Sequence, residues 1–328
     1  MSKLGAAHSL PKIVNLQKKV LKYGILGVPF GKGQKKDGVQ DGADAIRNSG
    51  LLARLQRPGC EVKDYGNVVW PEVQPLQHKF NINNLEHVAA CHKEVSRRAR
   101  AVLHESDVCV ALGGDHSLSL GSVDGHAAAR GELALLWVDA HADANTPDTS
   151  PSGSAHGMPV SLLARELAAC WAPVPPLGWL ATRLPAKNIA YIGLRSVDEY
   201  ERILLEKFNI TAFTMEDVER LGIASVTAMA LQMIDPKLEL PLHVSFDIDS
   251  LDPLEAPSTG TPVRGGLTLR EGLHVMDEAF RTGRLSAVDL VEVNPKIGDQ
   301  RDVTNTIEAA IKILEAACGH SRRGNYPQ

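Results

Sequence analysis

Short apolar runs alternate along this chain with segments whose apolar residues recur every three or four positions. A run of four to eight apolar residues is typical of a buried parallel strand, and spacings of three and four are typical of a helix. The runs predict strands at 23–28, 108–112, 133–138, 188–194, 241–246 and 288–293. The periodic segments predict helices at 41–56, at 85–103, from about 159, from 268 and at 303–317.

This alternation predicts an α/β fold in which a doubly wound parallel sheet carries helices on both faces. No linker-like Pro/Gly/Ser tract divides the chain, and we find no internal repeat or low-complexity segment. We therefore expect one domain over residues 23–328, preceded by a basic extension over residues 1–22.

Acidic residues follow two of the predicted strands, 133–138 and 241–246. The functional crevice of an open α/β sheet lies at the carboxyl ends of its strands, and side chains i, i+2 and i+4 of an extended chain point the same way. We therefore expect the side chains that follow these strands to converge. Four ionised carboxylates in one place need cations, and two divalent ions would balance them. The residues in question are Asp139, His141, Asp143, Asp247 and Asp249.

His116 also follows a predicted strand and completes a candidate set of six metal ligands. Carboxylates and imidazoles without cysteine disfavour a sulfur-rich zinc site and suit Mn²⁺, Mg²⁺ or Fe²⁺. Two ions about 3.5–4 Å apart could share Asp139 and Asp247 and hold a water that ionises near neutral pH and becomes a nucleophile. Single Asp or His residues at strand ends are more often caps, but the D-x-H-x-D and D-x-D motifs together favour metal binding.

Composition narrows the function class further. The chain has 328 residues, of which 44% are hydrophobic, and a formal net charge of −4, which gives no reason to expect a nucleic-acid partner. No apolar stretch reaches the roughly 18 residues of a membrane span. The five scattered cysteines form no C-x-x-C pair and indicate reduced thiols.

The start of the chain is basic, with five lysines before Gly24 and no acidic residue before Asp37. An acid-poor amphipathic start resembles a mitochondrial presequence, but this one lacks arginine before Gly24 and is interrupted by Pro11. A solvated extension is the alternative. We expect the protein in the cytoplasm or the mitochondrial matrix.

Three motifs together resemble the ureohydrolase family, and four further segments resemble the arginases within it. The resemblance runs from about residue 24 to residue 324. The ureohydrolase motifs are Gly-Gly-Asp-His-Ser at 113–117, Asp-Ala-His-Ala-Asp at 139–143 and Ser-Phe-Asp-Ile-Asp-Ser-Leu-Asp-Pro at 245–253. The arginase-like segments are 145–147, 152–157, 259–262 and 291–295.

The resemblance implies a single catalytic domain around an eight-stranded parallel sheet, a pair of Mn²⁺ ions, and hydrolysis of L-arginine to L-ornithine and urea. One ion would be held by His116, Asp139, Asp143 and Asp247, and the other by Asp139, His141, Asp247 and Asp249. His156 matches a proton shuttle, and Glu292 matches the carboxylate that holds the guanidinium. The positions that match the substrate-binding residues are Asn145, Ser152, Ser154, Asp198, Glu201 and Thr261.

The physical case for these roles stands beside the resemblance. A guanidinium is cationic and resonance-stabilised, so its carbon is a poor electrophile that needs a strong nucleophile. A carboxylate such as Glu292 can orient the planar fork with two hydrogen bonds. His156 titrates near neutral pH and can protonate the leaving amine. The alternatives are a capped strand end for Glu292 and a loop hydrogen bond for His156.

Two positions depart from the family pattern, Ser154 where asparagine is usual and Ser196 where aspartate is usual. The first predicts a raised KM for L-arginine with little change in kcat, since the loss affects ground and transition states alike. Four buried-looking residues fit structural roles: His126, His243, Trp137 and Asp289. For Asp289, partnership with a ligand histidine is an equal alternative.

The rival functions are another ureohydrolase such as an agmatinase, a non-catalytic protein with the same fold, and a dinuclear phosphoesterase. Retention of Asn145 and Ser152 favours arginase over agmatinase. A phosphoesterase would need basic residues beside the site, and Arg195 alone does not make a phosphate clamp. The resemblance also implies a homotrimer, with Arg322 or Arg323 at the contact, although arginines near a C-terminus are more often solvated.

Overall fold

The strands form one sheet whose central strands are buried on both faces. The computed structural model describes residues 20–57, 59–74, 78–181, 184–320 and 322. All strand pairs are parallel, and the order is β2-β1-β3-β8-β7-β4-β5-β6. The strands are β1 (Leu21–Val28), β2 (Cys60–Asn67), β3 (Val108–Gly113), β4 (Ala134–Val138), β5 (Ile189–Leu194), β6 (Thr211–Thr214), β7 (Leu242–Asp247) and β8 (Leu285–Val291). The predicted α/β fold with an eight-stranded parallel sheet is confirmed.

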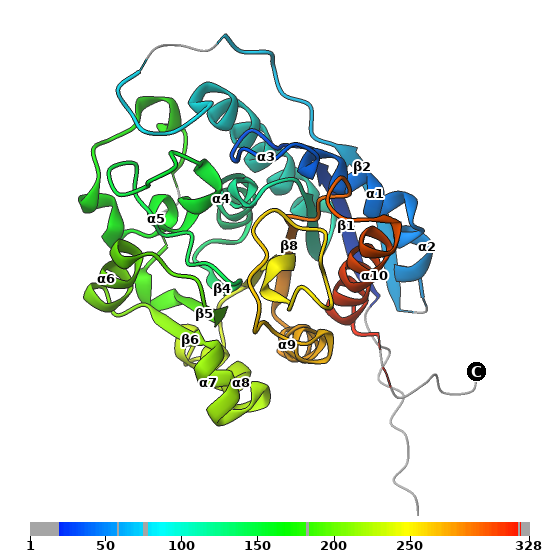
Figure 1. Cartoon of the computed structure of the whole chain (residues 1–328). Helices are drawn as coiled ribbons and strands as arrows, with labels where there is room; N and C mark the ends of the chain where they lie inside the picture. The colour runs from blue at the N-terminus through cyan, green and yellow to red at the C-terminus, as the bar shows by residue number, and fades with distance from the viewer. Residues whose placement is uncertain (1–19, 58, 75–77, 182–183, 321, 323–328) are drawn as a thin grey trace, which may run out of the picture.

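Helices cover both faces of the sheet (Figure 1). One core contains residues of α1 (Gly42–Asn48), α2 (Leu51–Leu55), α7 (Met215–Leu221), α8 (Ile223–Ile234), α9 (Leu269–Arg281) and α10 (Gln300–Ala317). The other contains residues of α3 (Leu85–Glu105), α4 (Ser119–Arg130), α5 (Pro159–Leu163) and α6 (Glu199–Lys207).

Strand β4 shows why an unbroken apolar run marks a central strand. Leu136 and Val138 belong to the first core, while Leu135 and Trp137 belong to the second. All four side chains are fully buried. Because alternate residues point to opposite faces and both faces are covered, every position must be apolar.

Several predicted boundaries were wrong. The single helix expected at 41–56 is two helices, since Gly50 between them has φ +85°, a left-handed conformation that ends an α-helix. The helix expected from about 159 is the short α5. Strand β1 begins at Leu21 and so includes two residues of the predicted extension. Residues 1–19 of that extension lie outside the described residues.

Strands β2 and β6 were not predicted. Both lie at the edges of the sheet, and β2 is exposed or half-buried at most of its positions. An edge strand with solvent beside it has no continuous apolar run, so the pattern that found the central strands is absent. Within the described ranges, no helix has both the length and the apolar character to cross a membrane.

The strand order places the functional motifs together. Strands β3, β8, β7, β4 and β5 are consecutive neighbours. Because all run in parallel, the loops after them emerge at one edge of the sheet, and those loops carry the predicted metal ligands.

Candidate metal centre and active site

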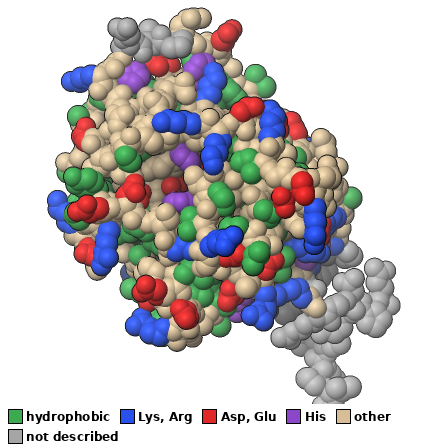
Figure 2. Space-filling model, in the orientation of Figure 1, with side chains coloured by type: hydrophobic (Ala, Val, Ile, Leu, Met, Phe, Trp, Pro, Cys, Tyr) green, Lys and Arg blue, Asp and Glu red, His purple; other side chains and the backbone are tan. Residues whose placement is uncertain are grey.

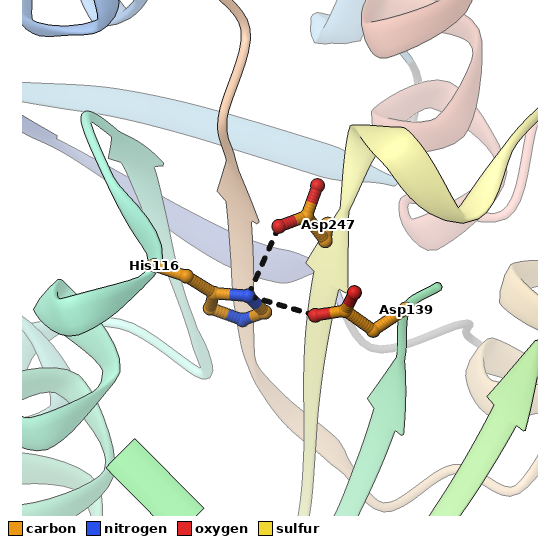
Figure 3. Close-up of side chains that lie close together, drawn as sticks. All are labelled: His116, Asp139 and Asp247. Carbon is orange, nitrogen blue, oxygen red and sulfur yellow. Dashed lines mark hydrogen bonds and ion pairs between the residues drawn. The ribbon is translucent and has the colours of Figure 1, made fainter. Parts of the chain in front are cut away.

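The first group of ligand candidates centres on His116, which opens the 3-10 helix η2 (His116–Leu118) after β3. Its Nδ1 lies near three carboxylate oxygens, 3.0 Å from Asp139 Oδ2, 3.1 Å from Asp143 Oδ2 and 3.1 Å from Asp247 Oδ2. Figure 3 shows His116 facing Asp139 at the end of β4 and Asp247 at the end of β7. All four side chains are buried.

The second group centres on His141. Its Nδ1 lies 3.2 Å from Asp249 Oδ2 and 3.4 Å from Asp139 Oδ1. Asp139 therefore presents one oxygen to each group. In each of the triads His116–Asp139–Asp247 and Asp139–His141–Asp249, the ligand atoms lie within 4.8 Å of one another. The structure thus brings together all six predicted ligands.

The convergence has a different local cause from the one predicted. The chain after β4 is not extended, since Asp143 has φ +48°, and Asp249 lies in the 3-10 helix η7 (Ile248–Ser250). Each strand-end carboxylate accepts a backbone N–H two residues ahead: Asp139 from His141 at 2.7 Å, and Asp247 from Asp249 at 2.8 Å. Tight turns, not strand alternation, aim the side chains inward.

Crowded carboxylates make this cluster favourable for cations. Burial and the charge of Asp139 raise the pKa of Asp143 to about 6, and burial with neighbouring carboxylates raises the pKa of Asp247. Burial opposes the charged form of His141, but Asp139 and Asp249 outweigh it and raise the pKa to about 12. Without a cation, bound protons relieve the repulsion. Oxygen and imidazole donors without sulfur fit a hard or borderline divalent metal.

Trp137 supports the first group from below. Its ring stacks on the His116 imidazole with centroids 4.1 Å apart, and its Nε1 donates to Asp139 Oδ2 at 3.0 Å. The side chain is fully buried. Trp137 therefore packs against the ligand candidates, in agreement with the packing role predicted for it. It also holds the Asp139 carboxylate by a hydrogen bond.

Glu292 and His156 form a pair beside the metal-ligand candidates. His156 Nδ1 lies 3.0 Å from Glu292 Oε1, which also accepts the backbone N–H of His116 at 2.9 Å. Glu292 is buried, follows β8 and has φ +63°, a strained conformation for a non-glycine residue. Burial disfavours the imidazolium of His156, but Glu292 outweighs it and raises the pKa to about 9.

A cavity of about 150 Å³ opens above these groups. Figure 2 shows histidine and acidic atoms inside a hollow on the face in view. The residues that line the cavity are His141, Asp143, Asn145, Ser150, Pro151, Ser152, His156, Gly157, Ser196, Asp198, Glu201, Asp247 and Thr261.

Comparison with known proteins identifies the family. The sequence model of the Arginase family matches residues 21–319. The chain belongs to the arginase family. It is 44% identical over 303 residues to the hepatic arginase of Aquarana catesbeiana, which covers 92% of this chain and 94% of that one. It is 43% identical over 305 residues to Arginase-1 of Homo sapiens, with the same coverage of 92% and 94%. It is 41% identical over 314 residues to the mitochondrial Arginase-2 of Homo sapiens, over 95% and 88% of the two chains.

Solved structures give the same answer for the fold. The arginase of Bacillus caldovelox superposes with a TM-score of 0.83 at 31% identity, over 92% of this chain and 99% of that one. The Entamoeba histolytica arginase in complex with L-ornithine superposes with a TM-score of 0.80 at 30% identity, over 92% and 99%. The predicted arginase resemblance is confirmed.

All but one of the predicted substrate residues of this arginase-family chain line the cavity. Asn145, Ser152, Asp198, Glu201 and Thr261 line the cavity, whereas Ser154 is not among its lining residues. Ser154 is buried, and its backbone N–H donates to Ser152 Oγ at 3.1 Å.

Several of these residues also hold the rim of the cavity together. Glu201 accepts the backbone N–H groups of Ala144 and Asp198, each at 2.9 Å, and burial raises its pKa to about 7. Asn145 donates to Asp198 at 2.8 Å. Thr261 donates to Asp249 Oδ2 at 2.9 Å and so lies against the second ligand group.

Arg195 does not face an anion site. Its guanidinium donates to main-chain carbonyls of Gly193, Asp249, Ser250, Leu251 and Val263. It therefore ties the loops together, in agreement with the rejection of a phosphate clamp.

Asp115 is a site-building residue that the sequence motifs contained but pattern reasoning did not single out. It is buried and accepts the Gly33 N–H at 2.7 Å, and the Gly33 carbonyl accepts the His156 N–H at 3.1 Å. Its position before the ligand candidate His116 in Gly-Gly-Asp-His was the available signal.

Proposed function

We propose that this chain is an arginase that hydrolyses L-arginine to L-ornithine and urea with two Mn²⁺ bound per subunit. The observation that carries the proposal is the position of Asp139, which presents one oxygen to each of two carboxylate–imidazole groups. The Glu292–His156 pair stands directly beside these groups. Family membership and the arginase relatives support the same reaction.

The donor sets fit two ions. His116, Asp139, Asp143 and Asp247 would hold one, and Asp139, His141, Asp247 and Asp249 would hold the other. Asp139 and Asp247 would be shared. When bound, such a pair neutralises the carboxylates and acidifies a water so that a nucleophile exists near neutral pH. An oxygen-rich set without sulfur suits Mn²⁺, Mg²⁺ or Fe²⁺, and among these we propose Mn²⁺ because the resemblance to the arginases implies it.

Glu292 is proposed to orient the guanidinium. Its carboxylate is buried and already held by the His116 main chain, so it can accept two N–H groups from a planar cation without losing its position. In the metal-free protein burial opposes the charged form of His156, but Glu292 outweighs it and raises the pKa to about 9, so its imidazole is protonated on both nitrogens at neutral pH. The proton on His156 is therefore available to the departing amine.

The cavity rim is proposed to bind the amino-acid end of the substrate. Polar side chains gather there from the loop after β4 and from the start of α6. Ser152 and Asn145 can donate to the α-carboxylate, and Asp198 can accept from the α-ammonium. Glu201 contributes mainly by fixing the rim, since both its oxygens accept backbone N–H groups. Thr261 and Ser154 complete the proposed set.

Urea release tests the reaction. The purified chain is incubated with Mn²⁺ and assayed with L-arginine and agmatine in parallel. We expect strong preference for L-arginine, because the rim offers partners for an α-carboxylate that agmatine lacks. Preference for agmatine would show that L-arginine is not the substrate. If neither compound yields urea, the proposed reaction is rejected. A chelator-treated sample is the matched control and should be inactive until Mn²⁺ returns.

Assembly as a homotrimer is a further part of the proposal. Arg322 is ion-paired with Asp277 at 2.8 Å within the chain, and Arg323 lies outside the described residues. Light scattering of the wild type and Arg322→Ala measures the oligomer. A wild-type protein that is monomeric and fully active would reject the proposal of a homotrimer.

For location we propose the cytoplasm or the mitochondrial matrix, since a mitochondrial Arginase-2 is among the relatives. A reporter fused to residues 1–30 tests the targeting role of the basic extension, and a diffuse signal would reject it.

A further inference from the structure

A chain of buried polar side chains leads away from the metal-ligand candidates into the protein. It begins at His116, whose Nε2 lies 2.9 Å from Ser245 Oγ on the side opposite its carboxylate partners. Ser245 Oγ donates to Asp289 Oδ2 at 3.1 Å. Asp289 Oδ2 also accepts from Ser122 Oγ at 2.7 Å and faces His243 Nε2 at 3.0 Å.

The chain continues to a second histidine. His243 Nδ1 lies 3.2 Å from His126 Nδ1, and His126 Nε2 lies 2.8 Å from Ser286 Oγ. His126, His243 and Ser245 are fully buried, and Asp289 is almost so. Structural roles were predicted for both histidines, and their contacts show that this part of the core is polar and connected.

In the two hydrogen bonds that lead from His116 to Asp289, the donor is each time the group nearer to His116. Ser245 has a single hydroxyl proton, which it gives to Asp289, so it can only accept from His116 Nε2–H. With its proton on Nε2, a neutral His116 leaves Nδ1 free toward Asp139, Asp143 and Asp247. This is the tautomer that a metal ligand needs.

Among the described residues, no Lys or Arg pairs with the Asp289 carboxylate. His243 is its ion-pair partner within the described ranges, and its other oxygen, Oδ1, has no hydrogen-bond partner there. Burial and His243 lower the pKa of His126 well below its usual range, so the far end of the chain is neutral. A buried carboxylate without Lys or Arg is costly, and its charge acts on His116 through Ser245.

We propose that Asp289, acting through Ser245 and held by the His243–His126 pair, is a positioning residue that fixes the orientation and tautomer of His116 for metal binding. It touches neither substrate nor metal. The inference rests on the proposed metal centre, and it adds four buried supporting side chains to one of its two ion positions.

Metal titration tests the role directly. Mn²⁺ is added to the metal-free wild type, Asp289→Asn and Ser245→Ala, and binding is followed by calorimetry and by the electron paramagnetic resonance signal of free Mn²⁺. We expect both variants to lose about 10–100-fold in affinity at one ion position, because outer partners of ligand histidines have effects of that size. The Mn²⁺ affinity of the other position should stay within about twofold of the wild-type value, because the histidine proposed there is His141.

Asp235→Asn is the matched control. Asp235 is equally buried and accepts the N–H groups of Glu239 and Leu240, but it pairs with Arg284 at the opposite end of the sheet. It should lower the melting temperature of the metal-free protein and leave Mn²⁺ affinity unchanged. Equal losses of affinity in Asp235→Asn and Asp289→Asn would mean a general structural effect and would overturn the proposal.

Two further outcomes are decisive. Folded Asp289→Asn and Ser245→Ala proteins that bind Mn²⁺ like the wild type would refute the positioning role. If Asp289→Asn does not fold, Ser245→Ala alone decides. A wild type that binds a single ion would defeat the two-ion proposal, and the positioning role would then be judged on the affinity for that ion.

Discussion

The floor of the site, made of the six metal-ligand candidates, contrasts with its rim, made of the proposed substrate residues. The floor residues lie at or just after the ends of strands β3, β4 and β7, over a buried layer that includes Trp137 and Ser245. The rim comes mostly from loops and the start of α6. The two positions that depart from the expected family pattern, Ser154 and Ser196, both lie in loops near the rim. On the proposed function, the chemistry would take place at strand ends, and substrate selection would be left to loops, which tolerate change.

The largest effect should come from removing Asp139, the ligand candidate that the two groups share. Asp139→Asn should reduce urea release by about 10³-fold or more, because both ions would lose a bridging charge. Bound Mn²⁺, measured by elemental analysis after gel filtration, should fall in parallel. Asp148→Asn, an exposed carboxylate on the same loop, is the control and should change neither. Full metal content in Asp139→Asn would contradict the shared position.

Glu292→Gln separates substrate orientation from metal binding. We expect kcat/KM to fall by about 10²–10³-fold, since removing one partner of a buried charge pair costs roughly 3–4 kcal/mol. Metal content should stay normal, because Glu292 touches the His116 main chain and not its ring. Loss of metal together with activity would assign Glu292 to the floor instead.

The His156–Glu292 pair should appear in the stability of the metal-free protein. The folded-state pKa of His156 is raised to about 9 from an ordinary 6.5, so its stabilisation is complete below pH 6.5 and is lost as pH rises through 9. Between pH 6 and pH 9.5 the wild type should lose about 3 kcal/mol more unfolding free energy than His156→Asn. Denaturant unfolding at each pH, with a chelator present, measures the unfolding free energy of the wild type and of His156→Asn. Parallel curves for the two proteins would mean that the pair does not stabilise the fold.

The smallest effect should come from the rim. Ser154→Asn should lower KM for L-arginine up to about tenfold with kcat unchanged, because a longer donor can restore one hydrogen bond to the α-carboxylate. KM for agmatine, which lacks that carboxylate, should not change and serves as the internal control. An equal change for both substrates, or none for L-arginine, would show that Ser154 is not a selectivity position.

Particular residues show how far sequence reasoning reached. The apolar runs located the central strands, because a strand covered on both faces must be apolar at every position. They missed β2 and β6, where one side meets solvent. The Asp-rich motifs located the floor, but the reason given was wrong, since Asp143 and Asp249 reach it through turns. The rim was located only by resemblance, because single Asn, Ser and Thr residues in loops carry no periodic signal.

By itself, the sequence determined the α/β class, the central strands and the residue types at their ends, since these follow from local periodicity and from side-chain chemistry. Only the tertiary structure decided that β3, β8, β7 and β4 are neighbours. That order is set by packing between segments far apart in the chain, and it brings His116, Asp139 and Asp247 together. It also places Asp289 on β8 beside Ser245 on β7, and the proposed positioning of His116 rests on this contact.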